Sequence, residues 1–377
     1  METLRTLPDA CVDSCVTDPP YGLAFMGKKW DYDVPGVELW SEVLRVLKPG
    51  GHLLAFAGTR TQHRMAVRIE DAGFEIRDMI AWVYGSGFPK SLDVSKAIDK
   101  AAGEEREVVG SADVGPDMRS GNYENASGRM IANITAPATE AAKQWAGWGT
   151  ALKPALEPIT VARKPFPGTV AENVLQHGTG ALNVDGCRVA FAGDADEQES
   201  KAKNQHAAFG SGPVKRNVCS DHDAPRANYS APGRFPANLI HDGSEEVVGL
   251  FPETAPAKMS DRGKGKGDTG TYGVYGGDPG VRGHDDAGGS AARFFYCAKA
   301  DASERRQSKH PTIKPVALMR YLVRLVTPPG GVVLDPFGGS GTTAEAARLE
   351  HCRFILLELS EEYCADAQER LRQGVLF

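Results

Sequence analysis

The residues best suited to chemistry stand in two short motifs near opposite ends of the chain. The first is Asp18-Pro19-Pro20-Tyr21, which follows the apolar run 12–17. Two prolines end the strand that this run predicts and leave the Pro19 carbonyl without a ladder partner. A carboxylate and a free carbonyl can together accept both hydrogens of an amino group, and an adjacent aromatic ring can stack on a flat substrate. A plain turn is the alternative interpretation of the two prolines.

The second motif is a glycine-rich turn between a predicted strand and a predicted helix. It consists of Asp335, Pro336, Phe337, Gly338, Gly339, Ser340, Gly341, Thr342 and Thr343. Glycines permit a tight turn and close approach of a ligand, and the helix start offers backbone N–H groups. Glu358 follows Asp335 by 23 residues, the spacing of a ribose-binding carboxylate in a nucleotide-binding βαβ unit. The glycine spacing fits neither a P-loop nor a GxGxxG turn, and a purely structural turn stays open.

Strands and helices alternate at both ends of the chain. Apolar runs predict strands over 12–17, 52–57, 74–84, 156–162, 291–298, 331–334 and 353–357. Helical spacing predicts helices over 39–47, 61–72, 316–326, 344–349 and 361–371. This alternation is typical of an α/β fold with a parallel sheet and crossover helices. Because both motifs follow strands, both are expected at the crevice where the strands' carboxyl ends meet.

The middle of the chain has a different composition. Residues 111–150 are rich in Ser, Gly, Asn and Ala, and residues 260–290 contain 11 glycines in 31 positions. Such segments bury too little apolar surface to offset the entropy of ordering them, so we expect a long loop-rich insertion.

Composition excludes several classes of protein. The net charge of −6 excludes a wholly basic nucleic-acid coat, so any DNA contact depends on local placement. No apolar run approaches the length of a membrane helix, and no secretory signal is recognisable. Seven scattered cysteines favour a reducing cytoplasm, and Cys11 and Cys15 lack the further ligands of a zinc site. We therefore expect a cytoplasmic protein with no metal and no membrane partner.

The two motifs together resemble those of the S-adenosylmethionine-dependent DNA amino-methyltransferases. The sequence reads DPPY at 18–21 and DPFGGSGTT at 335–343, in the order of the circularly permuted β group. The segments HPTIKP at 310–315, LKPGGHLLAF at 47–56 and WVYGSGFPKS at 82–91 also resemble family motifs. The resemblance implies a Rossmann-like class I methyltransferase fold with a mostly parallel seven-stranded sheet. It also implies that the strand before Asp335 lies beside the strand before Asp18.

The resemblance implies a role for each motif. Asp18, Pro19, Pro20 and Tyr21 would act on the exocyclic amine of a base flipped out of double-stranded DNA, with adenine N6 favoured. The cofactor S-adenosylmethionine would contact the glycine-rich motif, with Glu358 on its ribose and Thr312 and Lys314 closing the pocket. Expected DNA contacts, with an ordinary solvated loop as the alternative at each, are Lys28, Lys29, Lys90, Arg262, Lys264 and Lys266.

The same resemblance divides the chain into three regions. Residues 1–110 would form the catalytic half of the methyltransferase domain and residues 301–377 the cofactor-binding half. Residues 111–300 would form the insertion, with the target-recognition region and a returning strand near 155–163. The Gly-Asp pair that relatives carry shortly before the DPPY strand, whose acid contacts the cofactor adenine, is not found here.

Several alternatives stay open. Cytosine-N4 methylation, methylation of RNA or protein, and an inactive DNA-binding relict would each keep this fold. Carbon-5 cytosine methylation is excluded, because that chemistry uses a cysteine after a proline and none of the seven cysteines follows one. A homodimer, a partner restriction nuclease and a phage or mobile-element context are compatible with the sequence but not specified by it.

Overall fold

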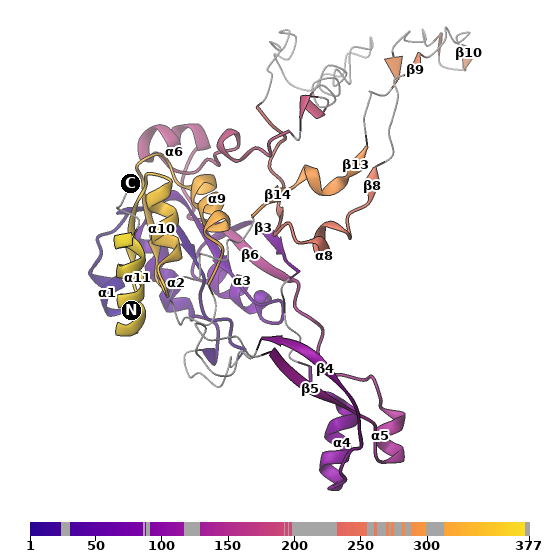
Figure 1. The fold of residues 1–377 in the computed structure, drawn as a ribbon. Coiled ribbons are helices and arrows are strands. Elements are labelled where there is room, and N and C mark those ends of the chain that lie inside the picture. Colours follow the sequence, from indigo (N-terminus) through magenta and orange to yellow (C-terminus); the bar gives the residue numbers. More distant parts are fainter. Residues whose placement is uncertain are drawn as a thin grey trace. The chain divides into compact units, whose positions relative to one another are not determined.

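The computed structural model describes residues 1–23, 31–85, 87, 91–116, 129–191, 193–194, 196–197, 232–254, 260–261, 269–270, 273–274, 281–282, 288–298 and 313–373. The chain divides into two compact units, one made of residues 1–85 and 156–377 and the other of residues 86–155 (Figure 1). Among the described residues, no helix is long and apolar enough to cross a membrane. The same residues contain no cluster of three His, Cys, Asp or Glu side chains that could hold a metal ion.

The larger unit is built on one eight-stranded sheet. Its strands, in spatial order, are β14 (Tyr296–Cys297), β7 (Leu239–His241), β3 (Glu75–Val83), β6 (Leu156–Arg163), β2 (Leu47–Phe56), β1 (Val12–Thr17), β15 (Val332–Asp335) and β16 (Arg353–Leu356). All neighbouring strands pair in parallel except β6, which is antiparallel to both β2 and β3. The prediction of an α/β fold with a mostly parallel sheet is therefore confirmed, as is the placement of β15 beside β1.

The expectation of seven strands in the sheet was wrong by one. The eighth strand is β14, whose two residues pair with the end of β7 at one edge of the sheet. Only two residues of the predicted strand 291–298 are extended in this way, because Ala291–Phe294 forms a 3-10 helix. β2 also begins earlier than expected, at Leu47, because that residue pairs with Val12 before the register shifts.

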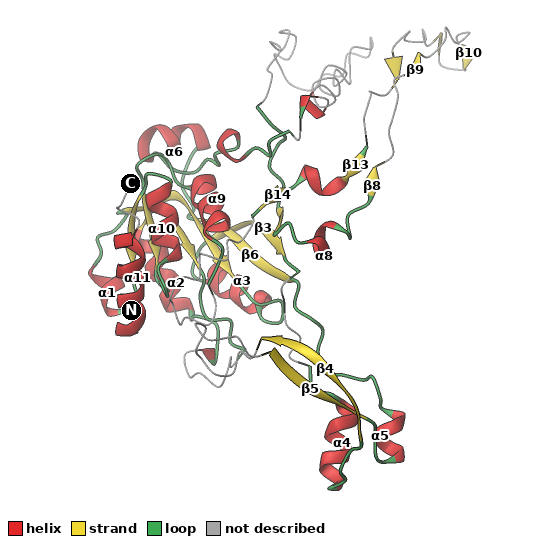
Figure 2. Ribbon diagram, viewed as in Figure 1, coloured by secondary structure: helices red, strands yellow, loops and turns green. Residues whose placement is uncertain are grey.

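Helices cover both faces of this sheet (Figure 2). The alternation of side chains along a strand sends successive residues to opposite faces, so Leu53 packs with α2 and α3 while Leu54 packs with α9 and α10. The apolar faces of these helices are buried, as at Trp40 of α2 and Leu322 of α9. The helices of the unit are α1 (Glu2–Thr6), α2 (Val37–Val46), α3 (Gln62–Asp71), α6 (Val170–His177), α8 (Glu245–Val248), α9 (Val316–Val326), α10 (Thr342–Leu349) and α11 (Glu361–Gln373).

Short two-residue strands pair in the part of the sequence that the glycine-rich run occupies. They are β8 (Glu253–Thr254) with β13 (Gly289–Ser290), β9 (Ser260–Asp261) with β12 (Val281–Arg282), and β10 (Thr269–Gly270) with β11 (Gly273–Val274). A 3-10 turn also lies at Asp185–Cys187. These elements are too short to form a core of their own.

The smaller unit is a β-hairpin with two helices. It contains α4 (Val94–Ala102), β4 (Val108–Pro116), the antiparallel β5 (Arg129–Thr135) and α5 (Glu140–Gln144). The buried Asp99 carboxylate accepts hydrogen bonds from Arg106 at 2.6 Å and from the Thr139 hydroxyl at 2.8 Å, which ties α4 to the start of α5. The loop predicted over 111–150 is therefore partly wrong, because most of β4 and all of β5 and α5 lie in it.

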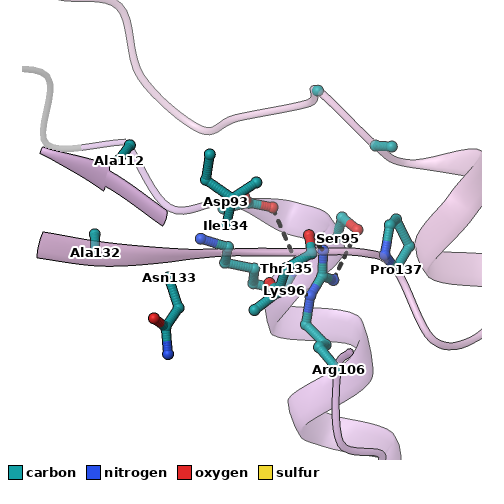
Figure 3. Close-up of a pocket in the computed structure, with 12 residues that line it drawn as sticks. Asp93, Ser95, Lys96, Arg106, Ala112, Ala132, Asn133, Ile134, Thr135 and Pro137 are labelled. Carbon is teal, nitrogen blue, oxygen red and sulfur yellow. Dashed lines mark hydrogen bonds between the residues drawn. The ribbon is translucent and has the colours of Figure 1, made fainter. Parts of the chain in front are cut away.

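The smaller unit also holds an open pocket of about 400 Å³. Figure 3 shows Arg106 reaching Ser95 and Thr135 on its wall. The pocket's lining contains none of the site residues predicted from the sequence.

Candidate functional site

The ends of β1 and β15 bring the two sequence motifs together. Cys15 pairs with Leu334, so the strands run in register and end side by side. The Thr17 hydroxyl donates a hydrogen bond to Asp335 Oδ1 at 2.6 Å, which links the last residues of the two strands. Asp18 follows immediately after Thr17. The two acidic residues of the motifs therefore lie at the same edge of the sheet, as their positions at the ends of parallel strands predict.

Asp18 is held by a buried cation and a tyrosine hydroxyl. Lys314 Nζ lies 2.6 Å from Asp18 Oδ2, and the Tyr21 hydroxyl donates to Asp18 Oδ1 at 2.7 Å. The Lys314 side chain is 8% exposed and the Asp18 side chain 23% exposed, so the carboxylate can still be reached from outside. Although burial lowers the pKa of Lys314, the charges of Asp18 and Glu157 raise it above its usual value. The lysine is therefore a fixed positive charge beside Asp18.

A second carboxylate, Glu157, joins this group. Its Oε2 lies 3.1 Å from Lys314 Nζ and accepts a hydrogen bond from the Tyr21 hydroxyl at 2.8 Å. Glu157 is the second residue of β6, and because β6 runs antiparallel its beginning lies where the neighbouring β2 ends. We did not predict Glu157 from the sequence, because the strand was recognisable there but its direction was not.

The loop after Asp18 is fixed by two further side chains. The Asp31 carboxylate, 3% exposed, accepts hydrogen bonds from the backbone N–H groups of Tyr21 and Gly22 at 2.7 and 2.9 Å. The Thr61 hydroxyl donates to the Tyr21 carbonyl at 2.6 Å. These bonds set the position of the Tyr21 ring, although neither residue lies in a motif. Pro19 is buried and Pro20 half-buried, so the two prolines form the wall of the loop.

Asp335 has a different environment. It is 3% exposed, and its carboxylate accepts hydrogen bonds from the hydroxyls of Thr17 and Thr343 and from the Phe337 backbone N–H. Burial raises the pKa of Asp335 to about 6. These bonds join β15 to the following turn and to the start of α10, so Asp335 shapes the turn rather than presenting a free carboxylate.

The turn itself requires glycine at two positions. A Cβ atom on Gly338 would come within 2.4 Å of the Leu356 side chain on β16. Gly341 has φ +82°, and a Cβ atom there would lie 2.8 Å from Ala367 Cβ on α11. The turn is therefore close-packed against β16 and α11, and Ser340, Thr342 and Thr343 are buried beside it. Helix α10 begins after Gly341, which makes no side-chain cap hydrogen bond to the helix start.

Glu358 follows β16 and faces this turn. Its Oε2 accepts a hydrogen bond from the Gly339 N–H at 2.8 Å, and Oε1 accepts from the N–H groups of Leu359 and Ser360 at 2.9 and 2.8 Å. A carboxylate can accept about four hydrogen bonds, so Oε2 retains capacity for one more donor such as a ribose hydroxyl. The half-buried carboxylate and the uncapped helix start fit a nucleoside cofactor with an anionic group.

One predicted cofactor residue contacts Asp18, and several predicted site residues lie outside the described part of the chain. Lys314, expected on the cofactor side of the pocket, contacts Asp18 instead, so a cofactor contact of Lys314 stays a prediction. The residues outside the described part of the chain are Thr312 and all the expected DNA contacts, namely Lys28, Lys29, Lys90, Arg262, Lys264 and Lys266.

Comparison with known families identifies the class of protein to which this arrangement of residues belongs. A family model described as DNA methylase, the N6_N4_Mtase family, matches residues 12–103 and 254–369. These segments amount to more than half of the 377 residues and contain both motifs. The chain therefore belongs to this DNA methylase family.

Individual relatives match shorter parts of the chain. The type II methyltransferase M.HindIII of Haemophilus influenzae is 29% identical over 151 residues, which is 39% of this chain and 38% of that protein. The putative methylase YubD of Escherichia coli is 47% identical over 62 residues, 16% of this chain and 27% of its own length. The DNA adenine methyltransferase YhdJ of Escherichia coli is 42% identical over 62 residues, 16% of this chain and 21% of its own. The chain thus aligns with less than two fifths of each of these relatives.

Proposed function

We propose that this protein transfers a methyl group from S-adenosylmethionine to the exocyclic amine of a base in double-stranded DNA. The observation that carries the proposal is that β1, which leads to Asp18, and β15, which leads to the glycine-rich turn, are adjacent and end side by side. One strand end presents a partly exposed carboxylate, and the other presents a close-packed turn with Glu358 beside it. The family membership supports the same reaction.

The residues of the β15 end would hold the cofactor. Glu358 has an acceptor position left for a ribose hydroxyl, and the N–H groups at the start of α10 favour a carboxylate. When bound, the cofactor supplies a methyl group on a positively charged sulfur, which leaves as a thioether with the bonding electron pair.

The residues of the β1 end would prepare the amine. An exocyclic amine is a weak nucleophile, because its lone pair is delocalised into the ring of the base. Asp18 and the Pro19 carbonyl would accept its two N–H groups and localise that pair, and Tyr21 would stack on the base. Methyl transfer then forms a carbon–nitrogen bond, and the nitrogen releases one proton. The target amine cannot reach Asp18 from within a stacked duplex, so base flipping is part of the proposal.

Adenine N6 is the favoured acceptor. The relative YhdJ is named as a DNA adenine methyltransferase, and its match supports adenine over cytosine. Cytosine N4 offers the same amine geometry to Asp18 and is the second candidate.

The test is transfer of tritiated methyl groups to unmethylated DNA, followed by nucleoside analysis. We expect N6-methyladenine as the labelled nucleoside. Labelled N4-methylcytosine would overturn the choice of base but not the reaction. Label in RNA or protein with none in DNA would overturn the proposed substrate, and no transfer to any of these would overturn the proposed function.

A further inference from the structure

Glu157 takes part in the Asp18 group, although it lies in neither motif. It projects from the start of β6 and its side chain is 18% exposed. Its Oε2 lies within 3.1 Å of both Lys314 Nζ and the Tyr21 hydroxyl, the same two groups that hold Asp18. Two carboxylates therefore share one ammonium and one phenol, and the Tyr84 hydroxyl is a further hydrogen-bond partner of Glu157.

The hydrogens of these shared donors can be counted. The Lys314 ammonium has three N–H groups, and it faces Asp18 Oδ2 at 2.6 Å, Glu157 Oε2 at 3.1 Å and the Tyr21 oxygen at 3.1 Å. All of its hydrogens are directed to this group. The Tyr21 hydroxyl has one hydrogen but lies within 2.8 Å of an oxygen of Asp18 and of an oxygen of Glu157. It can bond fully to only one carboxylate at a time.

The same hydroxyl stays protonated. Burial raises the pKa of Tyr21 well above its usual value, and the charges of Asp18 and Glu157 raise it further. The hydroxyl is therefore a donor that must always find an acceptor, because a buried donor without one is unfavourable.

We propose that Glu157 is a positioning residue that accepts the Tyr21 hydrogen when the target amine occupies Asp18 Oδ1. The inference rests on the proposed function, because it assumes that an amine binds at Asp18. In the structure the Tyr21 hydroxyl occupies the Asp18 oxygen that the amine needs. Rotation of that hydrogen to Glu157 releases the oxygen without leaving Tyr21 unpaired, and Lys314 remains neutralised by both carboxylates.

The experiment is a double-mutant cycle between Glu157→Met and Tyr21→Phe. Methionine keeps much of the side-chain length and removes the acceptor, whereas phenylalanine keeps the ring and removes the donor. We expect Glu157→Met to lower kcat/KM for DNA about tenfold in the presence of Tyr21 and less than threefold in the Tyr21→Phe background. Glu157→Gln retains an acceptor oxygen, so it should preserve more activity than Glu157→Met. Cofactor affinity should not change in any of these variants.

A matched control is a carboxylate that pairs with the other end of β6. Glu75 pairs with Arg163, the last residue of β6, at 2.6 Å. Glu75→Met also removes a carboxylate that pairs with β6, and it should leave kcat/KM unchanged. If Glu157→Met does not fold, as judged by thermal unfolding, Glu157→Ala takes its place in the cycle.

Each outcome decides the proposal. If Glu157→Met lowers kcat/KM equally with Tyr21 and with Tyr21→Phe, its role is merely structural and the proposal is overturned. The proposal is also overturned if Glu157→Met is as active as an active wild-type protein. A wild-type protein that transfers no methyl group to DNA would instead overturn the proposed function and this inference with it.

Discussion

Two acidic residues lie at the ends of adjacent parallel strands, Asp18 just after β1 and Asp335 as the last residue of β15, and their surroundings differ. Asp335 is buried and accepts hydrogen bonds from two hydroxyls and a backbone N–H. Asp18 is partly exposed and lies against the Lys314 ammonium and the Tyr21 hydroxyl. Uncharged donors thus hold Asp335 inside the fold, whereas Asp18 lies beside a buried cation with part of its side chain exposed. This difference supports the proposal that Asp335 shapes the glycine-rich turn and that Asp18 contacts the amine.

The largest effect is expected at the β1 end. Asp18→Ala removes the acceptor that would localise the amine lone pair, and methyl transfer should fall by about 1000-fold or more. Tritiated methyl transfer to DNA measures this loss. An Asp18→Ala protein with activity near that of the wild type would contradict the proposed role of Asp18 in methyl transfer.

Lys314→Met should have the second largest effect. Without the ammonium, Asp18 and Glu157 face each other with no neutralising charge, and we expect kcat/KM to fall about 100-fold. Lys314→Arg keeps the charge and should recover part of the activity. Lys143, an exposed lysine paired with Glu140, offers the control, because Lys143→Met should leave the rate unchanged. Equal rates for Lys314→Met and the wild type would show that the cation does not support Asp18.

Substitutions in the turn after β15 should lower the stability of the protein. Gly341→Ala places a side chain at φ +82° and against Ala367, and the unfolding free energy should fall by about 2–3 kcal/mol. Gly330 has φ +70° and no atom within 4 Å of an added Cβ, so Gly330→Ala should cost only about 1 kcal/mol. Urea unfolding of both variants separates backbone strain from collision. Equal losses would show that the packing of the turn against α11 contributes little.

The β15 end should also show a pH dependence of stability. Because the pKa of Asp335 is raised to about 6 from an ordinary value of 3.8, the folded protein holds this proton more tightly than the unfolded chain. The stability that Asp335 contributes is therefore greatest below about pH 4 and falls as the pH rises to about 6, by at most about 1.4 kcal/mol per pH unit. Urea unfolding between about pH 4 and 6 gives the unfolding free energy of the wild type and of Asp335→Asn. The wild-type value minus the Asp335→Asn value should fall as the pH rises. A difference that grows with pH would contradict the raised pKa.

Much of the larger unit could be predicted from the sequence. The helix predicted over 316–326 is α9, residue for residue, because its apolar side chains recur at helical spacing. Strands β1 and β15 were recognisable because each carries two valines and ends at an Asp-Pro pair. The resemblance then placed the two strands side by side.

The site residues outside the motifs could not be predicted in the same way. Glu157 reaches Asp18 only because β6 runs antiparallel, and strand direction leaves no mark in a short apolar run. Asp31 acts through backbone N–H groups ten residues or fewer along the chain, a contact that depends on the path of the loop. In the smaller unit, the composition of residues 111–150 concealed the hairpin of β4 and β5. The caps Asp93 and Thr139 are local sequence signals for its helices.

The division of roles between the two strand ends is tested most directly by the dissociation constant of S-adenosylmethionine for Asp18→Ala and for Glu358→Gln, measured by calorimetry beside the wild type. We predict that Asp18→Ala binds the cofactor within about threefold of the wild type, and that Glu358→Gln, with a weaker acceptor for the ribose, binds about tenfold more weakly. The reverse pattern, with cofactor binding lost in Asp18→Ala and unchanged in Glu358→Gln, would contradict the assignment of chemistry to β1 and of the cofactor to β15.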